Sequence, residues 1–404
     1  MSATPLSLVT LALTGACNLR CAYCYQDTKS RARMAWPVMR AAVGRLLESP
    51  APDRGLVFAG GEPLLAFDLV QRAVRYVGRR RPAGSVVRYV LATNGTLLRP
   101  DTIAFLDAHR FALELSFDGV LPAQALRGKR SFARIDAALD HLRDHAPEMF
   151  RQRLAVAATL DADAVPFLSE SFAYFVHKRI PAISLSPAAG QSAKWTPRVI
   201  DRLERELAAV YALARRHYED TGAVPLVAFR KTRSDARPAR TRPVCGAAQS
   251  ASITIDVDGE VYACPMLAES SRTFANPGLA ATIQPMRMGH VADPAFWPRL
   301  AALPARARAT GIFHVGPRRH SLHGQCIRCR HHRGCSACPV AVLSEPAHED
   351  AQRIPDYLCA FNWSLQSLRE RFPVQPDDAD LLSGRARLPR LVRELLNETR
   401  AARV

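Results

Sequence analysis

Ten cysteines occur in two widely separated groups of this 404-residue chain. Three lie between positions 17 and 24, and the other seven lie between positions 245 and 359. The long stretch between the two groups contains none. Clustered cysteines are typical of bound metal or iron–sulfur clusters, whereas structural disulfides are typical of secreted proteins. The pattern therefore predicts two cysteine-rich metal-binding regions.

The first group reads Cys17-Asn-Leu-Arg-Cys21-Ala-Tyr-Cys24, a C-x3-C-x2-C spacing. Three thiolates on one short loop can bind three irons of a [4Fe–4S] cluster, and the fourth iron then stays open for a substrate or cofactor. A structural zinc site normally has four ligands, arranged in C-x2-C pairs. The loop therefore favours an iron–sulfur cluster over zinc or over three unrelated cysteines.

The charge balance, +18 at neutral pH, is compatible with nucleic acid, an anionic membrane or an acidic peptide as partner. The basic residues are spread along the chain, apart from Arg79-Arg80-Arg81 and the stretch 230–242. This spread favours an arginine-rich composition without a nucleic-acid partner. No apolar run is long enough to span a membrane, and the first residues lack a secretory signal. We therefore expect a cytoplasmic protein.

Short apolar runs alternate with helical patterns over the first 190 residues. Runs of this kind are typical of strands buried on both faces of a parallel sheet. Six such units in order predict an α/β fold, a partial (β/α)6 TIM-like barrel with a carboxyl-terminal cysteine-rich iron–sulfur domain. A doubly wound sheet is the alternative. The predicted strands are Leu8–Thr14, Leu56–Ala59, Val86–Ala92, Ala112–Phe117, Leu154–Leu160 and Ala182–Ser186, and helical patterns cover Leu64–Val77 and Ile135–Leu142.

The second half contains fewer regular patterns. Thr196 and Pro197 predict the start of a helix that runs to His217. An alternating stretch from Ser252, the turn Asp258-Gly259 and a return from Glu260 predict a hairpin. A helix is expected after the cysteine-rich segment, and Leu388–Leu396 predicts a final amphipathic helix. The expected domains are a core at 1–220, a basic linker at 221–244, an auxiliary domain at 245–372 and a tail at 373–404.

The C-x3-C-x-aromatic-C loop, placed after the first predicted strand, resembles the signature of the radical SAM superfamily. The resemblance implies that Cys17, Cys21 and Cys24 are the catalytic cysteines, and that they hold a [4Fe–4S] cluster whose open iron binds S-adenosyl-L-methionine. Reduction of that cluster yields a 5′-deoxyadenosyl radical in the family. The resemblance also places Tyr23 beside the adenine.

Three further segments match the family at the ends of successive predicted strands. Gly60-Gly61-Glu62-Pro63 resembles the segment that meets the methionine amino group, and its glycines allow a close approach of the backbone. Asn94 and the pair Ser116 and Asp118 follow the third and fourth strands, where the family has cofactor-binding residues. Arg127 is expected to contact the cofactor carboxylate, although the usual preceding His-Asp pair is replaced here by Pro122-Ala-Gln-Ala-Leu.

The seven remaining cysteines resemble the SPASM extension of peptide-modifying radical SAM enzymes, which holds two auxiliary iron–sulfur clusters. By resemblance, Cys326, Cys329, Cys335 and Cys359 hold one cluster, and Cys245, Cys264 and Cys338 hold the other, both expected to be [4Fe–4S]. The family has three residues between the last two cysteines of the central group, and this chain has only Ser336 and Ala337. With three cysteines, the first auxiliary cluster has either an open iron or a non-cysteine ligand. Spacing alone also allows a zinc ribbon of Cys326, Cys329, Cys335 and Cys338.

The resemblance implies an enzyme that oxidatively cross-links or dehydrogenates a ribosomally made peptide or protein, with a flavodoxin- or ferredoxin-type electron donor. A small-molecule radical dehydrogenase is an alternative. A sulfatase-maturase-like enzyme is another, although those relatives have an Asp where Pro265 follows Cys264. The remote alternative is a zinc-stabilised protein that binds nucleic acid.

Overall fold

The cysteine loop at residues 17–24 follows directly after the first strand of a nine-stranded sheet. The computed structural model describes residues 5–26, 29–231, 245–271, 281, 284–313, 318–332, 334–345, 350 and 352–375. The strands of the main sheet are β1 Leu8–Ala12, β2 Asp53–Ala59, β3 Val86–Thr93, β4 Ala112–Ser116, β5 Leu154–Leu160, β6 Ile183–Pro187, β7 Ser252–Ile255, β8 Glu260–Tyr262 and β9 Arg287–His290.

Strands β1 to β6 pair in parallel and in sequence order, which gives the sheet order β6-β5-β4-β3-β2-β1-β7-β8-β9. A doubly wound sheet would need a reversal of strand order at a switch point. The order observed here has none among β1 to β6, so the partial barrel predicted from the sequence is confirmed. The carboxyl ends of these strands share one edge, where active sites of such folds lie.

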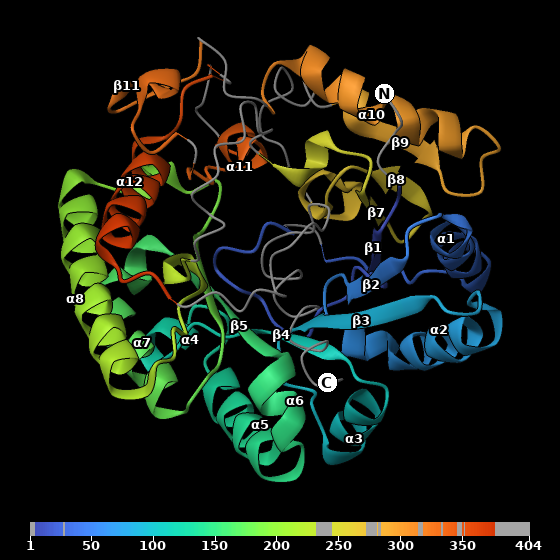
Figure 1. Ribbon diagram of the computed structural model, residues 1–404, viewed down its shortest axis with the longest axis horizontal. Coiled ribbons are helices and arrows are strands. Elements are labelled where there is room, and N and C mark those ends of the chain that lie inside the picture. The colour runs from blue at the N-terminus through green and yellow to red at the C-terminus, as the bar shows by residue number, and fades with distance from the viewer. Residues whose placement is uncertain are drawn as a thin grey trace.

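Helices cover the outer face of the curved sheet (Figure 1). Each strand from β1 to β5 is followed by at least one of them, as expected for parallel strands joined by crossovers. The helices of the barrel are α1 Trp36–Glu48, α2 Phe67–Arg80, α3 Pro100–Ala108, α4 Leu121–Gln124, α5 Ser131–His145, α6 Pro147–Arg153, α7 Leu168–His177 and α8 Pro197–Thr221. Thr196 caps α8 by accepting a hydrogen bond from the Val199 N–H, as its residue type predicts.

The six predicted strands all exist, with ends that differ by at most a few residues. The largest difference is β2, which begins at Asp53 and not at Leu56. The helix expected from Leu64 starts as a short 3-10 turn at Pro63–Ala66 and becomes α2 only at Phe67. Residues 224–229, which the sequence places in a linker, are mostly buried, and Leu226 bridges to Ile183 at the sheet edge. The expected helix Leu388–Leu396 lies outside the described residues.

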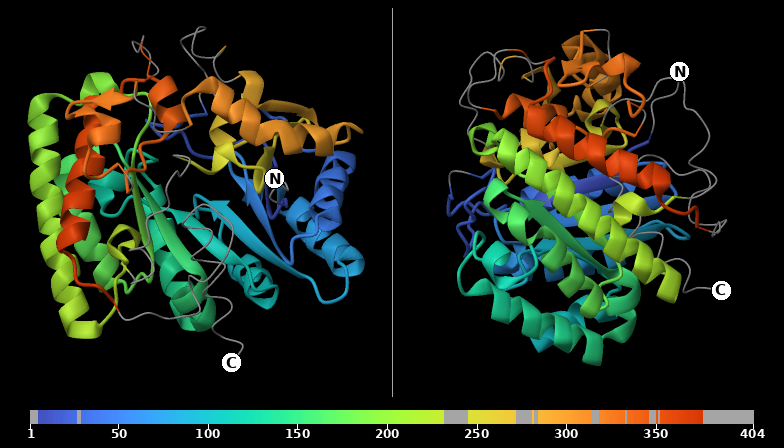
Figure 2. Two further views of the ribbon diagram at one scale, coloured as in Figure 1. Left: turned by 45° about the horizontal axis from the view of Figure 1, so that its top comes forward. Right: turned by 90° about the vertical axis from the view of Figure 1, so that its left-hand side faces the viewer.

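The carboxyl-terminal region continues the barrel sheet. Strand β7 pairs in parallel with β1, and β8 and β9 extend the sheet as antiparallel strands. The remaining elements are α10 Phe296–Thr310, β10 His320–Ser321, β11 Gly324–Gln325, α11 Pro339–Leu343 and α12 Asp356–Arg371. Helix α12 lies against α8, so the region contacts both edges of the barrel (Figures 1 and 2).

Two buried side chains tie this region to the end of β6. Tyr357 on α12 stacks on Trp195 and donates a hydrogen bond to the Ala188 carbonyl. Glu345 accepts hydrogen bonds from the N–H groups of Gly190 and Ser192 and from Tyr357. A buried carboxylate is stable only when donors satisfy it, so these contacts hold the two parts in one arrangement.

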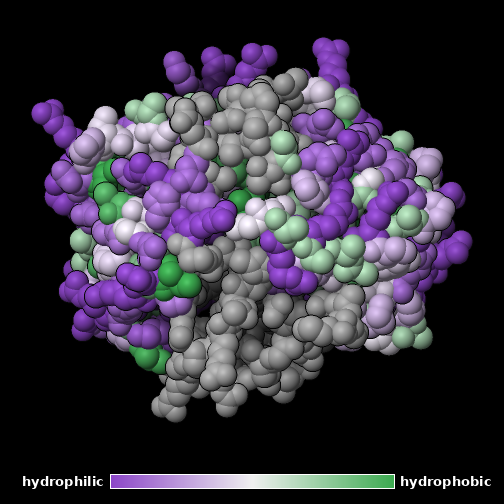
Figure 3. All heavy atoms as spheres, turned by 90° about the horizontal axis from the view of Figure 1, so that it is seen from above, coloured by the Kyte–Doolittle hydropathy of each residue, from purple (hydrophilic) through white to green (hydrophobic). Residues whose placement is uncertain are grey.

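Hydrophilic side chains predominate on the face shown in Figure 3, and the hydrophobic ones form small separate patches. Within the described part of the chain, no helix has the length and apolar character needed to cross a bilayer.

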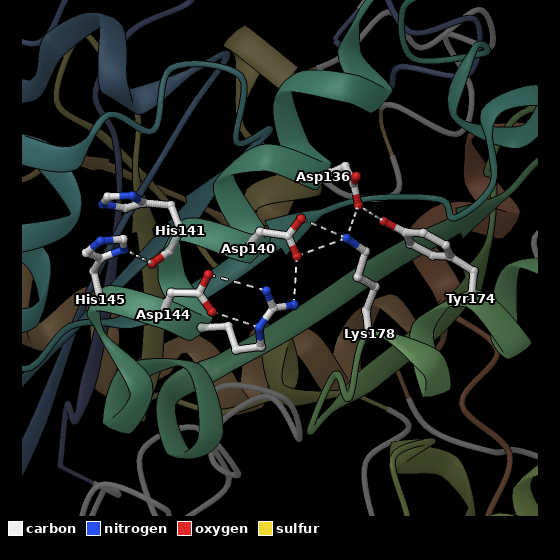
Figure 4. A network of polar contacts seen from close by, with 8 residues as sticks. Asp136, Asp140, His141, Asp144, His145, Tyr174 and Lys178 are labelled. Atoms are coloured by element: carbon white, nitrogen blue, oxygen red, sulfur yellow. Dashed lines mark hydrogen bonds and ion pairs between the residues drawn. The ribbon is translucent and has the colours of Figure 1, made fainter.

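A network of charged side chains joins α5 to α7 on the outside of the barrel (Figure 4). The Lys178 ammonium contacts both Asp136 and Asp140, and Tyr174 donates a hydrogen bond to Asp136. Arg143 also contacts Asp140, but its side chain is 41% exposed whereas that of Lys178 is 14% exposed. Ion pairs gain strength as water is excluded, so Lys178 is the partner that holds the helices together.

We expect Lys178→Met to lower the free energy of unfolding by about 1–2 kcal/mol, because two carboxylates then lose a partly buried cation. The matched variant Arg143→Met removes an exposed cation from the same network and should cost less stability than Lys178→Met. Urea denaturation followed by circular dichroism measures both. Equal losses in the two variants would contradict this account of α5–α7 packing.

Candidate functional site

The loop that carries Cys17, Cys21 and Cys24 is held against the ends of β2 and β4. The Gly61 N–H donates to the Thr14 carbonyl at 2.8 Å, and the Glu62 N–H donates to the Ala16 carbonyl at 2.9 Å. On the other side, the Ala22 N–H donates to the Leu126 carbonyl at 2.8 Å. These backbone contacts fix the loop at the carboxyl edge of the sheet.

Gly60 and Gly61 are required for this close approach. A Cβ atom on Gly61 would lie 2.2 Å from the Ala16 carbonyl oxygen, which is backbone and cannot move alone. Gly60 has a φ of +126°, which other residues rarely adopt. The glycine pair that the sequence singled out therefore brings the β2 end into backbone contact with the cysteine loop.

Hydrogen-bond donors point at the sulfur atoms of this loop. Cys17 Sγ lies 3.5 Å from the Leu19 nitrogen and 3.8 Å from the Asn94 side-chain nitrogen. Lys29 Nζ lies 3.1 Å from Cys24 Sγ. Burial raises the pKa of Cys21 to about 11, and the Arg127 charge opposes that rise. Donors and cations around sulfur fit thiolates that ligate an iron–sulfur cluster.

Glu62 is fully buried and acts within the protein scaffold. Its carboxylate accepts hydrogen bonds from the Leu64 and Asn94 N–H groups and from the Thr93 hydroxyl, at 2.7–3.0 Å. Burial raises its pKa, and these three donors oppose the rise. Asn94 in turn donates to the Asn18 side chain at 2.9 Å. The predicted cofactor-binding residues Glu62 and Asn94 thus connect β2, β3 and the cysteine loop, and Pro63 begins the short turn that follows.

Asp118, Arg127 and Tyr23 form a buried polar cluster at the ends of β4 and β5. The Arg127 guanidinium donates to both Asp118 oxygens at 2.9 Å and to the Thr159 hydroxyl at 3.2 Å. Tyr23 donates to the same carboxylate and lies under the guanidinium. Burial alone would lower the pKa of Arg127, but the Asp118 charge raises it, so the guanidinium stays charged. Ser116 is the last residue of β4 beside this cluster.

The contact of Arg127 with a cofactor carboxylate remains a prediction. In this structure the guanidinium is paired with Asp118, and Thr159 and the Ala157 carbonyl occupy another of its N–H groups. The fold does bring together Tyr23, Asp118 and Arg127, which the resemblance predicts as cofactor-binding residues. They lie next to Cys21, and the charges of Arg127 and Asp118 both affect its pKa.

Three of the carboxyl-terminal cysteines, Cys245, Cys264 and Cys338, form the group that we call group I. Burial is the main cause of the raised pKa of Cys264, and the charges of Cys245 and Cys338 raise this pKa further. Each of the three immediately precedes a short helical turn whose N–H groups point at its sulfur: Ala247 and Ala248 at Cys245, Met266 and Leu267 at Cys264, and Val340 and Ala341 at Cys338. Such donors stabilise thiolates.

The other four, Cys326, Cys329, Cys335 and Cys359, form group II. Burial is the main cause of the raised pKa of Cys359, and the charges of Cys335 and Cys329 raise this pKa further. Cys335 and Cys359 likewise raise the pKa of Cys326. Ser321 hydrogen-bonds both Cys326 and Cys359. The two groups coincide with the two ligand sets that the resemblance implies.

The zinc ribbon that spacing alone allows would need Cys338 beside Cys326, Cys329 and Cys335. The fold instead places Cys338 with Cys245 and Cys264. Cys338 is the residue that precedes and caps α11. Among the described residues, no three or more His, Cys, Asp and Glu side chains converge tightly enough for a single metal ion. A four-iron cluster spans a larger space, so more widely set thiols suit it.

Two residues that sequence reasoning did not single out as functional lie inside the barrel. Glu114 on β4 shares the inner face with Ala112, and its neighbours in register are Ala92 and Ala155. Burial raises the pKa of Glu114 to about 7, and no hydrogen bond or ion pair to it is seen among the described residues. Every other carboxylate that is more deeply buried accepts hydrogen bonds: Glu62, Asp118, Asp161, Glu206, Asp256 and Glu345.

Tyr25 links the cysteine loop to this interior. Enclosure by protein, and then the charges of Cys24, Glu114 and Cys264, raise its pKa to about 12. The side chain is nevertheless 49% exposed. The first cysteine loop, the inner carboxyl group and group I therefore meet around one ring. A polar residue at an inward strand position was the available signal for Glu114.

Gly61→Ala should disrupt the first cysteine site, because the added Cβ collides with the loop backbone. We expect loss of iron from that site after reconstitution, and a fall of roughly 100-fold in any activity that depends on it. Gly78→Ala is the matched control, since nothing lies within 4 Å of the position of its Cβ. Wild-type iron content in Gly61→Ala would contradict this geometry.

Glu114→Gln should stabilise the fold at neutral and alkaline pH. The carboxyl pKa rises from 4.5 to about 7 on folding, so the wild type loses stability as pH rises through this interval. The variant should gain on the order of 2 kcal/mol above pH 7, and the ionisation should make no difference below pH 4. Denaturation at several pH values measures this, with the exposed Glu204→Gln as control. A pH-independent difference would show that Glu114 is not desolvated.

Known proteins share part of these features. Residues 11–150 match the model of the radical SAM superfamily. A cysteine-type anaerobic sulfatase-maturating enzyme of Clostridium perfringens is 25% identical over 187 residues, 43% of this chain and 49% of that protein. The aligned part thus spans about half the length of that curated relative.

Solved structures share the fold over most of the chain. A histidine-tagged form of anSMEcpe with bound AdoMet has a TM-score of 0.72 at 17% identity, and the match covers 91% of this chain and 94% of that one. Streptococcus suis SuiB bound to precursor peptide SuiA has a TM-score of 0.53 at 12% identity, and the match covers 88% of this chain and 76% of that one.

The match over residues 11–150 identifies this part of the chain as a radical SAM domain, and the chain as a whole shares the fold of the anSMEcpe structure.

Proposed function

We propose that this enzyme reductively cleaves S-adenosyl-L-methionine and oxidatively modifies a peptide or protein, with two auxiliary iron–sulfur clusters that take up electrons. The observation that carries the proposal is the grouping of all ten cysteines. Cys17, Cys21 and Cys24 lie on one loop, and the other seven separate into groups I and II. A single metal site or incidental cysteines would leave several of these thiols unexplained.

The [4Fe–4S] cluster and S-adenosyl-L-methionine, when bound at Cys17, Cys21 and Cys24, supply a 5′-deoxyadenosyl radical that abstracts a substrate hydrogen. The protein positions the reactants and excludes water. Gly60 and Gly61 fix the cysteine loop by backbone contact, and the buried Asp118–Arg127 pair holds Tyr23 at the side of Cys21.

Glu114 suits the role of proton acceptor in the oxidation. Oxidation of a substrate radical would release a proton as well as an electron, and auxiliary clusters held by groups I and II would supply the electron acceptor. Glu114 lies on the inner face of β4, its pKa is raised to about 7 by burial, and it has no partner among the described residues. A carboxyl group with this pKa can accept a proton at neutral pH.

A peptide or protein substrate is favoured by the resemblance in fold to SuiB, whose structure holds its precursor peptide. A substrate segment would lie beside the half-exposed Tyr25, on which charges of both the first loop and group I act. A flavodoxin- or ferredoxin-type protein is the proposed electron donor.

Sulfatase maturation is the second candidate, and the similarity to the Clostridium perfringens enzyme favours it. Pro265 and Met266 follow Cys264 here, where an Asp is expected by resemblance to those enzymes. Incubation with a synthetic sulfatase peptide that carries the target cysteine or serine, followed by mass spectrometry, separates the two candidates. Oxidation of that residue would favour maturation of sulfatases over modification of a dedicated precursor.

We expect about twelve irons per chain after anaerobic reconstitution of the wild type, which corresponds to three four-iron clusters. Replacement of Cys17, Cys21 and Cys24 by Ala should remove about four irons and all formation of 5′-deoxyadenosine. The matched variant Cys326/Cys329/Cys359→Ala should also lose about four irons but still cleave S-adenosyl-L-methionine. Iron analysis and chromatography of the nucleoside measure both.

Two results would contradict the proposal. Zinc in place of iron, with no 5′-deoxyadenosine from the wild type, would exclude the radical chemistry. About eight irons in the wild type would leave that chemistry intact but show that one of the two auxiliary groups holds no four-iron cluster.

A further inference from the structure

Arg319 lies between group I and group II and is almost completely buried, with 4% of its surface exposed. Its guanidinium donates to the Ala337 carbonyl at 2.9 Å and is 3.5 Å from the Ile312 carbonyl. No carboxylate among the described residues pairs with it. A buried cation without an anion costs several kcal/mol, on the order of the cost of breaking a buried ion pair. Some other negative charge must therefore compensate it.

The cysteines of both groups face Arg319, and as thiolates they would supply this negative charge. Cys335 and Cys326 of group II act on it, and so do Cys338 and Cys245 of group I. Ala337, its hydrogen-bond acceptor, belongs to the two-residue segment that connects Cys335 of group II to Cys338 of group I. The Arg319 carbonyl also accepts a hydrogen bond from the Cys326 N–H at 2.8 Å. The side chain is thus held at the junction of the two groups.

Other buried arginines have different surroundings. Arg127 is paired with Asp118, and Arg153 with Asp107. Arg54 donates to carbonyl groups at the end of α1, where the helix dipole is negative. Arg319 alone among these four is surrounded by cysteines. The short connection of Ser336 and Ala337, anchored by Asn362 on α12, brings the two groups to the same guanidinium.

We propose that Arg319 is a positioning residue shared by the two auxiliary clusters and that its positive charge raises the reduction potential of both. The inference rests on the proposed function, since it requires clusters at groups I and II. Reduction adds one negative charge to a cluster, and a fixed cation nearby stabilises the reduced form more than the oxidised form. Both clusters thereby become better acceptors for an electron released during substrate oxidation.

The test is a redox titration monitored by electron paramagnetic resonance, in a Cys17/Cys21/Cys24→Ala background so that only the auxiliary clusters contribute. Arg319→Gln removes the charge and Arg319→Lys retains it. The exposed neighbour Arg318→Gln is the matched control. We expect both auxiliary potentials to become more negative in Arg319→Gln, by at least a tenfold change in the reduction equilibrium, which is about 59 mV for one electron. Arg319→Lys and Arg318→Gln should stay near the wild-type values.

Unchanged potentials in Arg319→Gln, or a shift in only one cluster, would overturn the proposal and leave the proposed function intact. If Arg319→Gln fails to retain iron, Arg319→Lys decides. Two clusters at wild-type potentials in the lysine variant support a requirement for charge, whereas loss of iron there as well shows a purely structural role. Absence of auxiliary iron from the wild type would instead contradict the proposed function itself.

Discussion

The two-sided pairing of β1 is the constraint on which the rest of the structure depends. This strand pairs in parallel with β2 on one side and with β7 on the other. Its carboxyl end leads into the Cys17 loop, β2 ends at Ala59 just before Gly60, and β7 leads through β8 to Cys264. One strand therefore places the first cysteine site and its glycine clamp side by side, and it joins both to the β7–β8 hairpin that carries Cys264 of group I.

Burial of many thiols imposes an electrostatic requirement on the same region. Burial raises the pKa of most of these cysteines, so thiolates are stable there only with compensation from metal, donors or cations. The chain supplies Lys29 at Cys24, helical N–H groups at group I, Ser321 at group II and Arg319 between the groups. Clusters with thiolate ligands would complete this balance of charge.

Much of the barrel could be predicted from the sequence, because buried parallel strands are short apolar runs and the cysteine loop directly follows one of them. Assignment of Cys338 needed the resemblance, since its C-x2-C spacing from Cys335 fits a zinc ribbon equally well. The fold places Cys335 in group II and Cys338, the N-cap residue of α11, in group I. Arg319 was not predictable, and Glu114 could be recognised only as a polar residue at an inward strand position. Nothing in Arg318-Arg319-His320 shows which arginine is buried, and a glutamate within an apolar strand does not reveal that it lacks a partner.

The central claim is that one cluster, at Cys17, Cys21 and Cys24, binds S-adenosyl-L-methionine while groups I and II hold separate clusters. Electron paramagnetic resonance of the reduced wild-type protein, with and without S-adenosyl-L-methionine, tests it most directly. The account predicts that the cofactor alters one component of the spectrum, and that this component is missing when the three cysteines are replaced by alanine. A spectrum that does not respond to the cofactor, or a response that survives the replacement, would contradict it.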